Sequence, residues 1–279
     1  MGTYAVTGSA SGMGRHTTEQ LRAAGHTVLG VDLHDAEVVA DLSTPQGRRR
    51  AGTEVLACCD GRLDGAVLAA GVGPGRGKDR PRLIANVNFL GAVELLEQWQ
   101  ATLAARGGAK VVVISSNSTT CTPVTPERAV RALLARDVDR ALRITRLFGP
   151  AYAAMTYSAS KIAVTRWLRR QAVTPAWAGA GIRLNALAPG AVMTPLLQEQ
   201  LADPRQEKAV RSFPVPVGGF GDPAQLAQWV CFMLSDAADF LCGSVIFVDG
   251  GTDAHFRPTD WPRTVPARGL LTYARRYRS

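Results

Sequence analysis

Two residues that could move a proton stand four positions apart, in the run Tyr157-Ser158-Ala159-Ser160-Lys161. Lysine is rare in this chain, so chance placement gives only roughly 0.07 pairs of this spacing. The segment to Ala178 is predicted to be helical, which puts both side chains on one helix face. A cation about 4 Å from the phenol favours phenolate by about 4 kcal/mol, enough to bring its pKa toward neutrality. The pair is a candidate general acid and base, and the alternative is an exposed polar pair.

A glycine-rich turn follows the first predicted strand and leads directly into a helix. Its sequence is Thr7-Gly8-Ser9-Ala10-Ser11-Gly12-Met13-Gly14. The glycines permit a tight turn and let a ligand approach the backbone closely, while the helix amino terminus offers free amides and a positive dipole. Such a turn suits the pyrophosphate of a dinucleotide.

An acidic residue, Asp32, ends the second predicted strand. A carboxylate there accepts both hydroxyls of an adenosine ribose and repels a 2′-phosphate, and residues 31–34 contain no Arg or Lys to receive that phosphate. This favours NAD over NADP, and the alternative is an aspartate that caps a turn. Asp41-Leu42 beside the adenine and Ala69-Ala70-Gly71 after the fourth strand are weaker candidates for the same ligand.

Short apolar runs alternate with amphipathic segments along the chain, as in a parallel sheet covered by helices on both faces. We expect one α/β domain over residues 1–256, a Rossmann-type doubly wound sheet of about seven strands. The predicted strands are Tyr4–Thr7, Thr27–Asp32, Ala66–Ala69, Lys110–Ser115, Arg183–Ala188 and Ser244–Val248, with a short one near Val38–Ala40. The predicted helices are Gly14–Ala24, Gln46–Cys59, Arg82–Ala105, Tyr157–Ala178 and Ala224–Leu234.

Two segments interrupt this alternation. In residues 117–156, apolar residues recur at helical spacing between Val130 and Leu142, which predicts one inserted amphipathic helix that packs on its own body or on another subunit. Residues 193–219 are rich in proline and apolar residues, a composition that suits a lid over an apolar substrate, although these residues can equally be packing residues. The apolar lid residues are Leu196, Leu197, Leu201, Phe213, Val215 and Val217.

Composition bears on the class of protein and its partners. No apolar run reaches membrane-spanning length, and we expect no signal peptide because the chain enters a strand at once. Five cysteines without metal-like spacing indicate reduced cytoplasmic thiols and no metal site. Much of the net charge of +9 lies in a basic tail, residues 257–279, which lacks a nucleic-acid motif and fits a solvated tail or a subunit contact better.

Together these residues resemble the short-chain dehydrogenase/reductase family over nearly the whole chain. Thr7-Gly8-x-x-x-Gly12-x-Gly14 is similar to its cofactor motif and Tyr157-x-x-x-Lys161 to its active site. Ser116 resembles the family's catalytic serine and Asn88 the asparagine that completes its tetrad. Ala69-Ala70-Gly71 departs from the family's Asn-Asn-Ala-Gly, which removes a side-chain contact in the central sheet and leaves the chemistry untouched.

The resemblance implies reversible hydride transfer between NAD and an alcohol or ketone carbon. Tyr157 would exchange the hydroxyl proton, and Lys161 would lower its pKa and hold the nicotinamide ribose. Ser116 would hydrogen-bond the substrate oxygen, and Asn88 would hold a water that links Lys161 to solvent. The alternatives are a strand-end cap for Ser116 and, for Asn88, a buried asparagine bonded to backbone.

The segment around the nicotinamide supplies Pro189, Val192 and Thr194, the last either a cofactor contact or a turn residue. Ala40-Asp41-Leu42-Ser43-Thr44 is one of the stretches that resemble the branch of bacterial 3-alpha-hydroxysteroid dehydrogenases and carbonyl reductases. In that branch the insertion covers a surface used for tetramers, which implies a homodimer here, with a tetramer as the alternative. The substrate would be a 3-alpha-hydroxysteroid or a xenobiotic carbonyl compound. Other readings are the same chemistry on an aromatic primary alcohol or a secondary-metabolite intermediate, and a non-catalytic NAD sensor.

Overall fold

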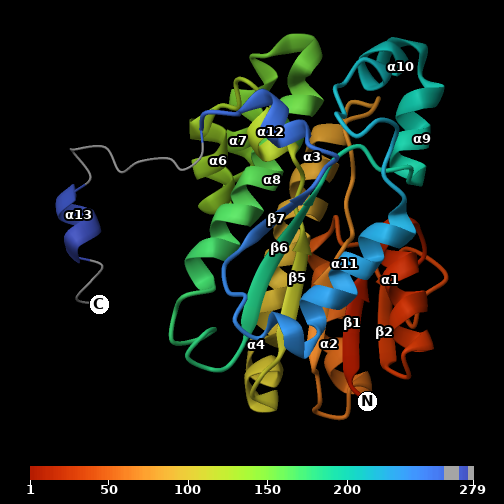
Figure 1. The fold of residues 1–279 in the computed structure, drawn as a ribbon, viewed down its shortest axis with the longest axis vertical. Helices are drawn as coiled ribbons and strands as arrows, with labels where there is room; N and C mark the ends of the chain where they lie inside the picture. Colours follow the sequence, from red (N-terminus) through yellow and green to blue (C-terminus); the bar gives the residue numbers. More distant parts are fainter. Residues whose placement is uncertain (261–269, 276–279) are drawn as a thin grey trace.

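The computed structural model describes residues 1–260 and 270–275 and contains one seven-stranded sheet (Figure 1). The strand order is β3-β2-β1-β4-β5-β6-β7, and every neighbouring pair is parallel. The order reverses between β1 and β4, and ligands bind beyond the carboxyl ends of the strands at such a point. The strands are β1 (Thr3–Thr7), β2 (Thr27–Asp32), β3 (Val38–Val39), β4 (Gly65–Leu68), β5 (Lys110–Ile114), β6 (Arg183–Pro189) and β7 (Val245–Val248). The predicted fold class is confirmed.

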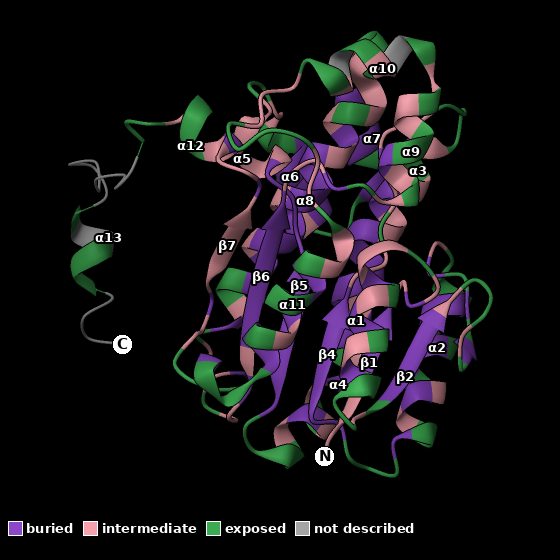
Figure 2. Ribbon diagram, turned by 45° about the vertical axis from the view of Figure 1, so that its right-hand side comes forward, coloured by how far each residue is buried: buried purple, intermediate pink, exposed green. Residues whose placement is uncertain are grey.

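Helices cover both faces of this sheet. Helices α1 (Gly12–Ala23) and α11 (Pro223–Leu234) contribute to one apolar core, and α2 (Pro45–Cys58), α4 (Ala92–Arg106) and α8 (Tyr152–Gln171) to the other. Within β5, Val112 joins the first core while Val111 and Val113 join the second, as the alternation of a strand requires. The central strands are therefore buried on both faces, which explains their uninterrupted apolar runs (Figure 2).

The remaining elements are short and lie mostly at the carboxyl edge of the sheet. They are α3 (Arg80–Ala85), the π-helix η1 (Asn86–Gly91), α5 (Ser118–Cys121), α6 (Glu127–Leu134), α7 (Val138–Arg146), η2 (Gly149–Ala151), α9 (Pro195–Ala202), α10 (Pro204–Arg211), η3 (Asp236–Ala238), α12 (Thr252–Phe256) and α13 (Leu270–Arg275).

The insertion before Tyr157 contains two longer helices, so the prediction of one amphipathic helix is wrong. Arg136 adopts φ 60° between α6 and α7, a left-handed conformation that ends the first helix. The Asp137 carboxylate then accepts the Arg140 amide at 2.9 Å and caps α7. Both helices bury their apolar faces in the core that includes α8, as Leu133 and Leu142 do. The spacing was helical throughout, but it did not reveal the turn.

Two predicted helix boundaries are also wrong. The helix that carries Tyr157 begins at Tyr152 and ends at Gln171, and Thr174-Pro175 lies in turns beyond it. Proline lacks the amide that would continue the helix, and it disfavours helical geometry in the residue before it. The predicted helix Arg82–Ala105 is divided into α3, the π-helix η1 and α4, because the backbone widens by one residue per turn at Asn86–Gly91.

Residues 193–219, predicted as a lid, contain helices α9 and α10, above the upper ends of the strands in Figure 1. The loop after β4 holds this lid from the other side. Arg76 donates two hydrogen bonds to the Asp203 carboxylate, at 3.0 and 2.5 Å, and the Gln200 amide donates to the Pro74 carbonyl oxygen at 3.3 Å. The predicted lid segment is therefore tied to the loop after β4.

The basic tail is described only in part. Arg257 pairs with Asp253 at 2.9 Å and so belongs to the folded body, and Arg275 lies in α13. The other tail arginines, Arg263, Arg268, Arg276 and Arg278, lie outside the described residues. The boundary between the domain, residues 1–256, and the tail, residues 257–279, stays a prediction, as does the cytoplasmic location. Over residues 1–260 and 270–275, no helix is both long and apolar enough to cross a membrane.

Candidate active site

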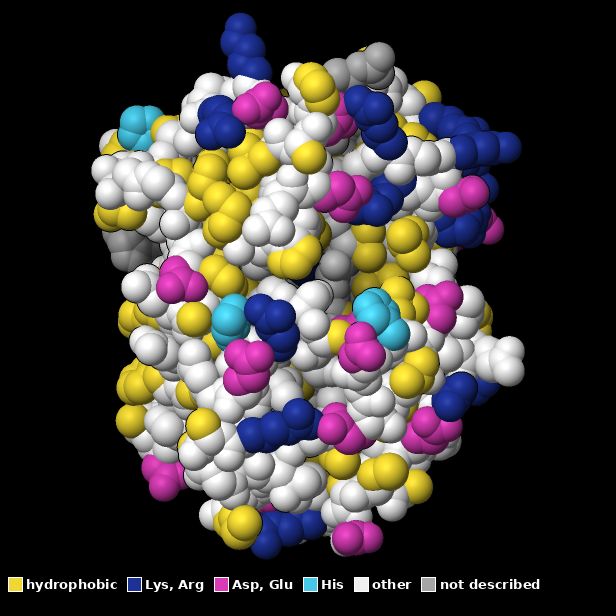
Figure 3. All heavy atoms as spheres, turned by 90° about the vertical axis from the view of Figure 1, so that its right-hand side faces the viewer, with side chains coloured by type: hydrophobic (Ala, Val, Ile, Leu, Met, Phe, Trp, Pro, Cys, Tyr) yellow, Lys and Arg dark blue, Asp and Glu magenta, His cyan; other side chains and the backbone are white. Residues whose placement is uncertain are grey.

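A cavity of about 830 Å³ lies between the carboxyl ends of the strands and the lid. Figure 3 shows a hollow on this side of the molecule, bordered by hydrophobic side chains. The cavity collects every predicted catalytic or cofactor-binding residue except Asn88, although these residues come from segments spread over most of the chain. Those that line it are Gly8, Ser11, Gly12, Met13, Gly14, Asp32, Asp41, Leu42, Ala70, Gly71, Ser116, Tyr157, Lys161, Pro189, Val192 and Thr194.

Tyr157 and Ser116 lie together in the wall of this cavity. The Ser116 hydroxyl hydrogen-bonds the Tyr157 phenol oxygen and lowers the pKa of the phenol. The Ser116 Oγ accepts the Ser118 amide at 3.1 Å, which fixes its position at the end of β5. Burial raises the pKa of Tyr157, and the Ser116 hydrogen bond opposes this rise only in part. The phenol thus keeps its proton and can donate it to a group in the cavity.

Lys161 stands behind the phenol on the same helix. Its Nζ donates to the Ile114 carbonyl oxygen at 2.7 Å and lies 5.9 Å from the centre of the Tyr157 ring. Burial lowers the pKa of Lys161 to about 8. The prediction that Lys161 brings the pKa of Tyr157 toward neutrality is wrong for the protein alone, because burial raises the pKa of the phenol and the group that opposes this rise is Ser116, not Lys161.

Asn88 lies beside the cavity and does not line it. Its Oδ1 accepts the Val72 amide at 2.8 Å and its Nδ2 donates to the Val72 carbonyl oxygen at 2.9 Å, so both polar groups hold one residue of the loop after β4. These bonds match the alternative expected for Asn88 from the sequence, a buried asparagine bonded to backbone. A Cβ placed on Gly71 would lie 3.6 Å from the Asn88 Oδ1 and 3.7 Å from the Lys161 Nζ, so Asn88 and Lys161 approach the same point of that loop.

The glycine-rich turn has the shape that a pyrophosphate needs. A Cβ on Gly14 would lie 2.1 Å from the Gly8 carbonyl oxygen, and one on Gly8 would lie 2.8 Å from the Ala70 amide nitrogen. Helix α1 begins at Gly12, its N-cap residue Ser11 makes no side-chain capping bond, and its first turn carries no acidic residue. Its first amides therefore remain available to an anion, and the turn fits a dinucleotide phosphate.

Asp32 is held at the end of β2 by two backbone amides. Its Oδ2 accepts from Ala10 at 2.9 Å and its Oδ1 from Leu33 at 2.7 Å. The carboxylate therefore caps the adjoining turns and also lines the cavity beside Asp41. Thr194 combines two roles in the same way: its hydroxyl donates to the Val192 carbonyl oxygen at 3.3 Å, and its methyl borders Gly12.

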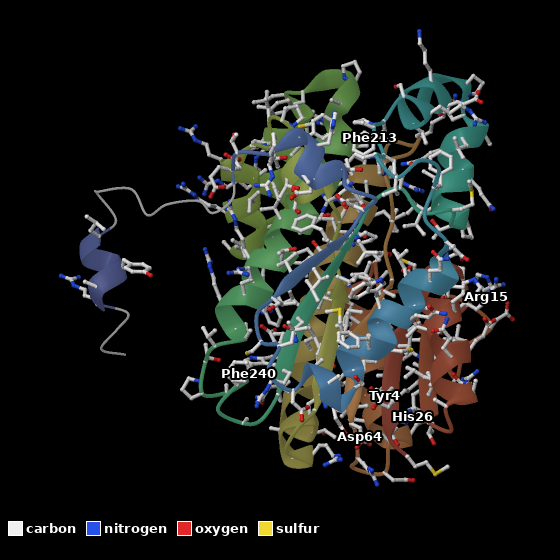
Figure 4. All side chains as sticks on the ribbon, viewed as in Figure 1. Tyr4, Arg15, His26, Asp64, Phe213 and Phe240 are labelled. Atoms are coloured by element: carbon white, nitrogen blue, oxygen red, sulfur yellow. The ribbon has the colours of Figure 1, made fainter. Side chains whose placement is uncertain are left out.

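The lid supplies an apolar wall, but not with all the residues that were predicted. Leu196, Leu197 and Phe213 (Figure 4) line the cavity, and the Phe213 ring packs at a tilt against Phe256 with ring centres 5.9 Å apart. Three of the predicted wall residues, Leu201, Val215 and Val217, do not line it. Val215 and Val217 pack over Gly250 instead, where a Cβ would lie within 2.9 Å of both.

Several residues that line the cavity were not predicted from the sequence. Asn117 and Ser118 follow directly after Ser116, and Thr122 lies one turn further on. Their position beside the predicted serine was the one available signal. Among the described residues, no group of histidine, cysteine and acidic side chains is arranged to hold a metal ion. The buried ionic cluster around Asp64 and Tyr4 lies at the opposite end of the sheet (Figure 4).

Comparison with known proteins agrees with this geometry. A family model described as enoyl-(acyl carrier protein) reductase matches residues 8–253. A 3-alpha-hydroxysteroid dehydrogenase/carbonyl reductase from Comamonas testosteroni is 39% identical over 264 residues, which cover 94% of this chain and 100% of that protein. The chain belongs to the short-chain dehydrogenase/reductase family. The predicted family is thus confirmed, and the protein is an oxidoreductase of that family.

Two further members show the range of substrates among relatives of this dehydrogenase/reductase. A coniferyl-alcohol dehydrogenase from a Pseudomonas species is 30% identical over 259 residues, covering 88% of this chain and 94% of that protein. The crystal structure of a 3-alpha-hydroxysteroid dehydrogenase from Pseudomonas sp. B-0831, complexed with NADH, matches with a TM-score of 0.85 and 42% identity. That match covers 93% of this chain and 100% of the Pseudomonas chain.

Proposed function

We propose that the protein interconverts a hydrophobic secondary alcohol and its ketone with NAD, the substrate being a 3-alpha-hydroxysteroid or a xenobiotic carbonyl compound. The observation that carries the proposal is the hydrogen-bonded pair Tyr157 and Ser116 in an apolar cavity that continues to the glycine-rich turn and Asp32. The hydroxysteroid dehydrogenases from Comamonas and Pseudomonas, one of them solved with NADH, support both the cofactor and the substrate class.

NAD, when bound, accepts or donates the hydride. In reduction, Tyr157 gives its phenolic proton to the substrate oxygen, and in oxidation the phenolate takes that proton back. Ser116, positioned by the Ser118 amide, hydrogen-bonds the same oxygen and stabilises the charge that develops there. The Lys161 ammonium stabilises the phenolate once it forms and hydrogen-bonds the nicotinamide ribose.

The route by which Tyr157 regains a proton involves Lys161 and Asn88. Lys161 has a pKa of about 8, low enough for the side chain to lose and regain a proton near neutral pH. Asn88 fixes the loop at Gly71, within reach of the Lys161 Nζ. We assign to Asn88 the retention of a water molecule at this point, which connects Lys161 to solvent.

Cofactor choice rests on Asp32. The two amides that hold its carboxylate at the cavity edge prevent it from turning away, so it meets the adenosine ribose of a bound dinucleotide. Its charge repels a 2′-phosphate, which favours NAD over NADP. Asp41 and Leu42 complete this end of the cavity beside the adenine.

We also propose a homodimer. Helices α6 and α7 of the insertion pack on α8 and bury Val130, Leu133 and Leu142 in the process. That part of α8 is therefore covered by the chain itself and cannot meet α8 of a second subunit. The dimer then forms through another surface. The alternative is a tetramer, which sedimentation distinguishes by mass.

The test follows nicotinamide absorbance with purified protein, NAD⁺ and a 3-alpha-hydroxysteroid, with NADP⁺ in parallel. We expect turnover with NAD⁺ that Tyr157→Phe abolishes while NADH binding is retained. Tyr152→Phe, at the start of the same helix and away from the cavity, is the matched control and keeps its activity. Turnover of an aromatic primary alcohol instead would favour the chemistry of the coniferyl-alcohol dehydrogenase. Binding of NADH without turnover on a broad substrate panel would favour a sensor.

A further inference from the structure

The residue after Tyr157 is a serine that the proposed chemistry does not use. Ser158 is 1% exposed and does not line the cavity, so a bound substrate does not touch it. It leaves helix α8 in another direction than Tyr157, because successive residues of a helix are turned by about 100°. A hydroxyl buried next to an acid or base needs hydrogen-bond partners, and the partners of Ser158 connect it to the active site.

Ser158 holds the segment that carries Ser116. Its hydroxyl donates to the Ser118 carbonyl oxygen at 3.2 Å. The amide of the same residue, Ser118, donates to the Ser116 Oγ at 3.1 Å. Both backbone groups of Ser118 are therefore bonded, one to the helix that carries Tyr157 and one to the Ser116 side chain. A shift of Ser118 away from α8 would also shift the donor that fixes Ser116.

A residue of the insertion completes this arrangement. Thr125 lies in the loop before α6, and its Oγ1 is 2.5 Å from the Ser158 Oγ. A serine hydroxyl has one proton, and the proton of Ser158 goes to the Ser118 carbonyl oxygen, so Thr125 is the donor to Ser158. Hydrogen bonds thus connect the insertion to Ser116 through Ser158 and the Ser118 backbone.

The orientation of the Ser116 hydroxyl bears directly on the proposed chemistry. Because the Oγ accepts the Ser118 amide, its own proton points elsewhere, to the Tyr157 phenol oxygen in the cavity wall. A substrate oxygen that enters beside the phenol meets the same proton. Without the Ser118 amide in place, the hydroxyl could rotate, and a donor with several orientations stabilises the developing charge less well.

We propose that Ser158 and Thr125 are positioning residues that orient the Ser116 hydroxyl through the Ser118 backbone, so that the insertion contributes to the reaction. The inference rests on the proposed function. It gives the insertion a second role besides the covering of α8. The alternative is that these bonds only pair buried polar groups and stabilise the fold.

The test is a double-mutant cycle with Ser116→Ala. The measured quantities are KM and the single-turnover rate of hydride transfer from the 3-alpha-hydroxysteroid to NAD⁺, which is separate from product release. We expect Ser116→Ala to lower this rate by about 100-fold and Ser158→Ala by about tenfold, with KM changed by less than about twofold. In the Ser116→Ala background, Ser158→Ala should lower the rate by less than about twofold, because the group on which it acts is absent.

Thr125 allows a conservative pair of variants. Thr125→Val removes the hydroxyl and keeps the shape of the side chain, so it should lower the hydride-transfer rate by about threefold. Thr125→Ser keeps the hydroxyl and should retain the wild-type rate. Equal rates in Thr125→Val and Thr125→Ser would overturn the part of Thr125 in the proposal.

A second pair of hydroxyls supplies the matched control. The Thr145 and Thr156 hydroxyls hydrogen-bond each other at 2.9 Å and also join the insertion to α8. Both residues are 1% exposed, and neither lines the cavity. Thr145→Val should unfold about 2–4 °C below the wild type, as Ser158→Ala should, but it should leave the hydride-transfer rate unchanged in both backgrounds.

The outcomes separate the positioning role from the proposed function. If Ser158→Ala lowers the rate by the same factor with and without the Ser116 hydroxyl, the two residues act independently and the positioning role is overturned. An equal loss of rate in Thr145→Val and Ser158→Ala assigns both hydroxyls to the stability of the fold and also overturns it. The proposed function stands in both cases, since the wild type is active. Absence of turnover by the wild type on a broad panel of alcohols overturns the proposed function and, with it, the role of Ser158.

Discussion

The Lys161 ammonium lies 5.9 Å from the centre of the Tyr157 ring and donates a hydrogen bond to the Ile114 carbonyl oxygen and not to the phenol. The two side chains share a helix face, as their spacing predicted, with Lys161 buried and Tyr157 half-buried in the cavity wall. Burial disfavours the charged form of each, so it raises the pKa of Tyr157 and lowers that of Lys161. The protein alone thus holds a protonated phenol, which is ready to act as the acid in ketone reduction.

Ultraviolet titration tests this protonation state. With the pKa of Tyr157 raised above its ordinary 10.0, the difference in tyrosinate absorbance between wild type and Tyr157→Phe should be less than half of its full size at pH 10. The other tyrosines are common to both proteins and cancel. A difference that develops near pH 7 or 8 would show that the Lys161 charge prevails over desolvation, as the spacing alone had suggested.

Replacing Lys161 by methionine should change how stability depends on pH. The folded protein binds this proton with a pKa of about 8, against 10.5 for an ordinary lysine. Between these values the unfolded chain holds more protons, so the free energy of unfolding of the wild type rises with pH. Lys161→Met removes this rise and should be more stable than wild type at pH 7, by at most about 3 kcal/mol, less the lost bond to Ile114.

Denaturant unfolding between pH 7 and 10 measures this effect as the difference between the two proteins. Burial raises the pKa of Cys121 and of Cys231, so above pH 9 these thiols give a slope of opposite sign. Both proteins carry these thiols, so their contribution cancels in the difference. Equal pH dependence in wild type and Lys161→Met would contradict the low pKa of Lys161.

The parts of the site that the sequence revealed are those set by local spacing. The glycine-rich turn, Asp32 at a strand end and the Tyr157–Lys161 pair are each specified by a few neighbouring residues, and the parallel sheet follows from its apolar runs. The π-helix that contains Asn88 could not be predicted from local spacing. The Asn88 side chain is bonded to Val72, which lies in a loop distant in the sequence.

Features that depend on contacts between distant segments were missed. The turn at Arg136 interrupts continuous helical spacing, because α6 and α7 must both bury an apolar face against α8. The sequence predicted Val215 and Val217 to be part of the lid wall, but they pack on Gly250. The shift in the pKa of Tyr157 was predicted in the wrong direction. The spacing of Tyr157 and Lys161 indicates a neighbouring charge, but it does not indicate how far the phenol is buried.

Adding a methyl group at Gly14 should damage the dinucleotide site. Its Cβ would lie 2.1 Å from the Gly8 carbonyl oxygen, so the turn has to move. We expect Gly14→Ala to lose about 1–3 kcal/mol of stability and most of its affinity for NADH. Gly91→Ala is the matched control, since its Cβ would meet no atom closer than 3.5 Å and alanine favours a helix. Equal effects of the two substitutions on NADH binding would exclude the turn as the phosphate site.

Replacing Asp32 by asparagine should weaken the preference for NADH over NADPH. Asparagine keeps one acceptor for the backbone amides of Ala10 and Leu33 but removes the negative charge that repels a 2′-phosphate. We expect the ratio of the two dissociation constants to shift by about tenfold or more toward NADPH, a change of about 1.4 kcal/mol. Fluorescence titration of both cofactors measures it.

Asp35→Asn provides the control for charge alone. Asp35 lies in the turn after β2 and is exposed, and its φ of 51° is one that asparagine tolerates. It does not line the cavity, and water and salt screen the charge of an exposed side chain, so the ratio should stay close to the wild-type value. An equal shift in both variants would mean that the net negative charge of this turn selects the cofactor. A shift confined to Asp32→Asn would mean that a carboxylate fixed by two amides makes the selection at the ribose.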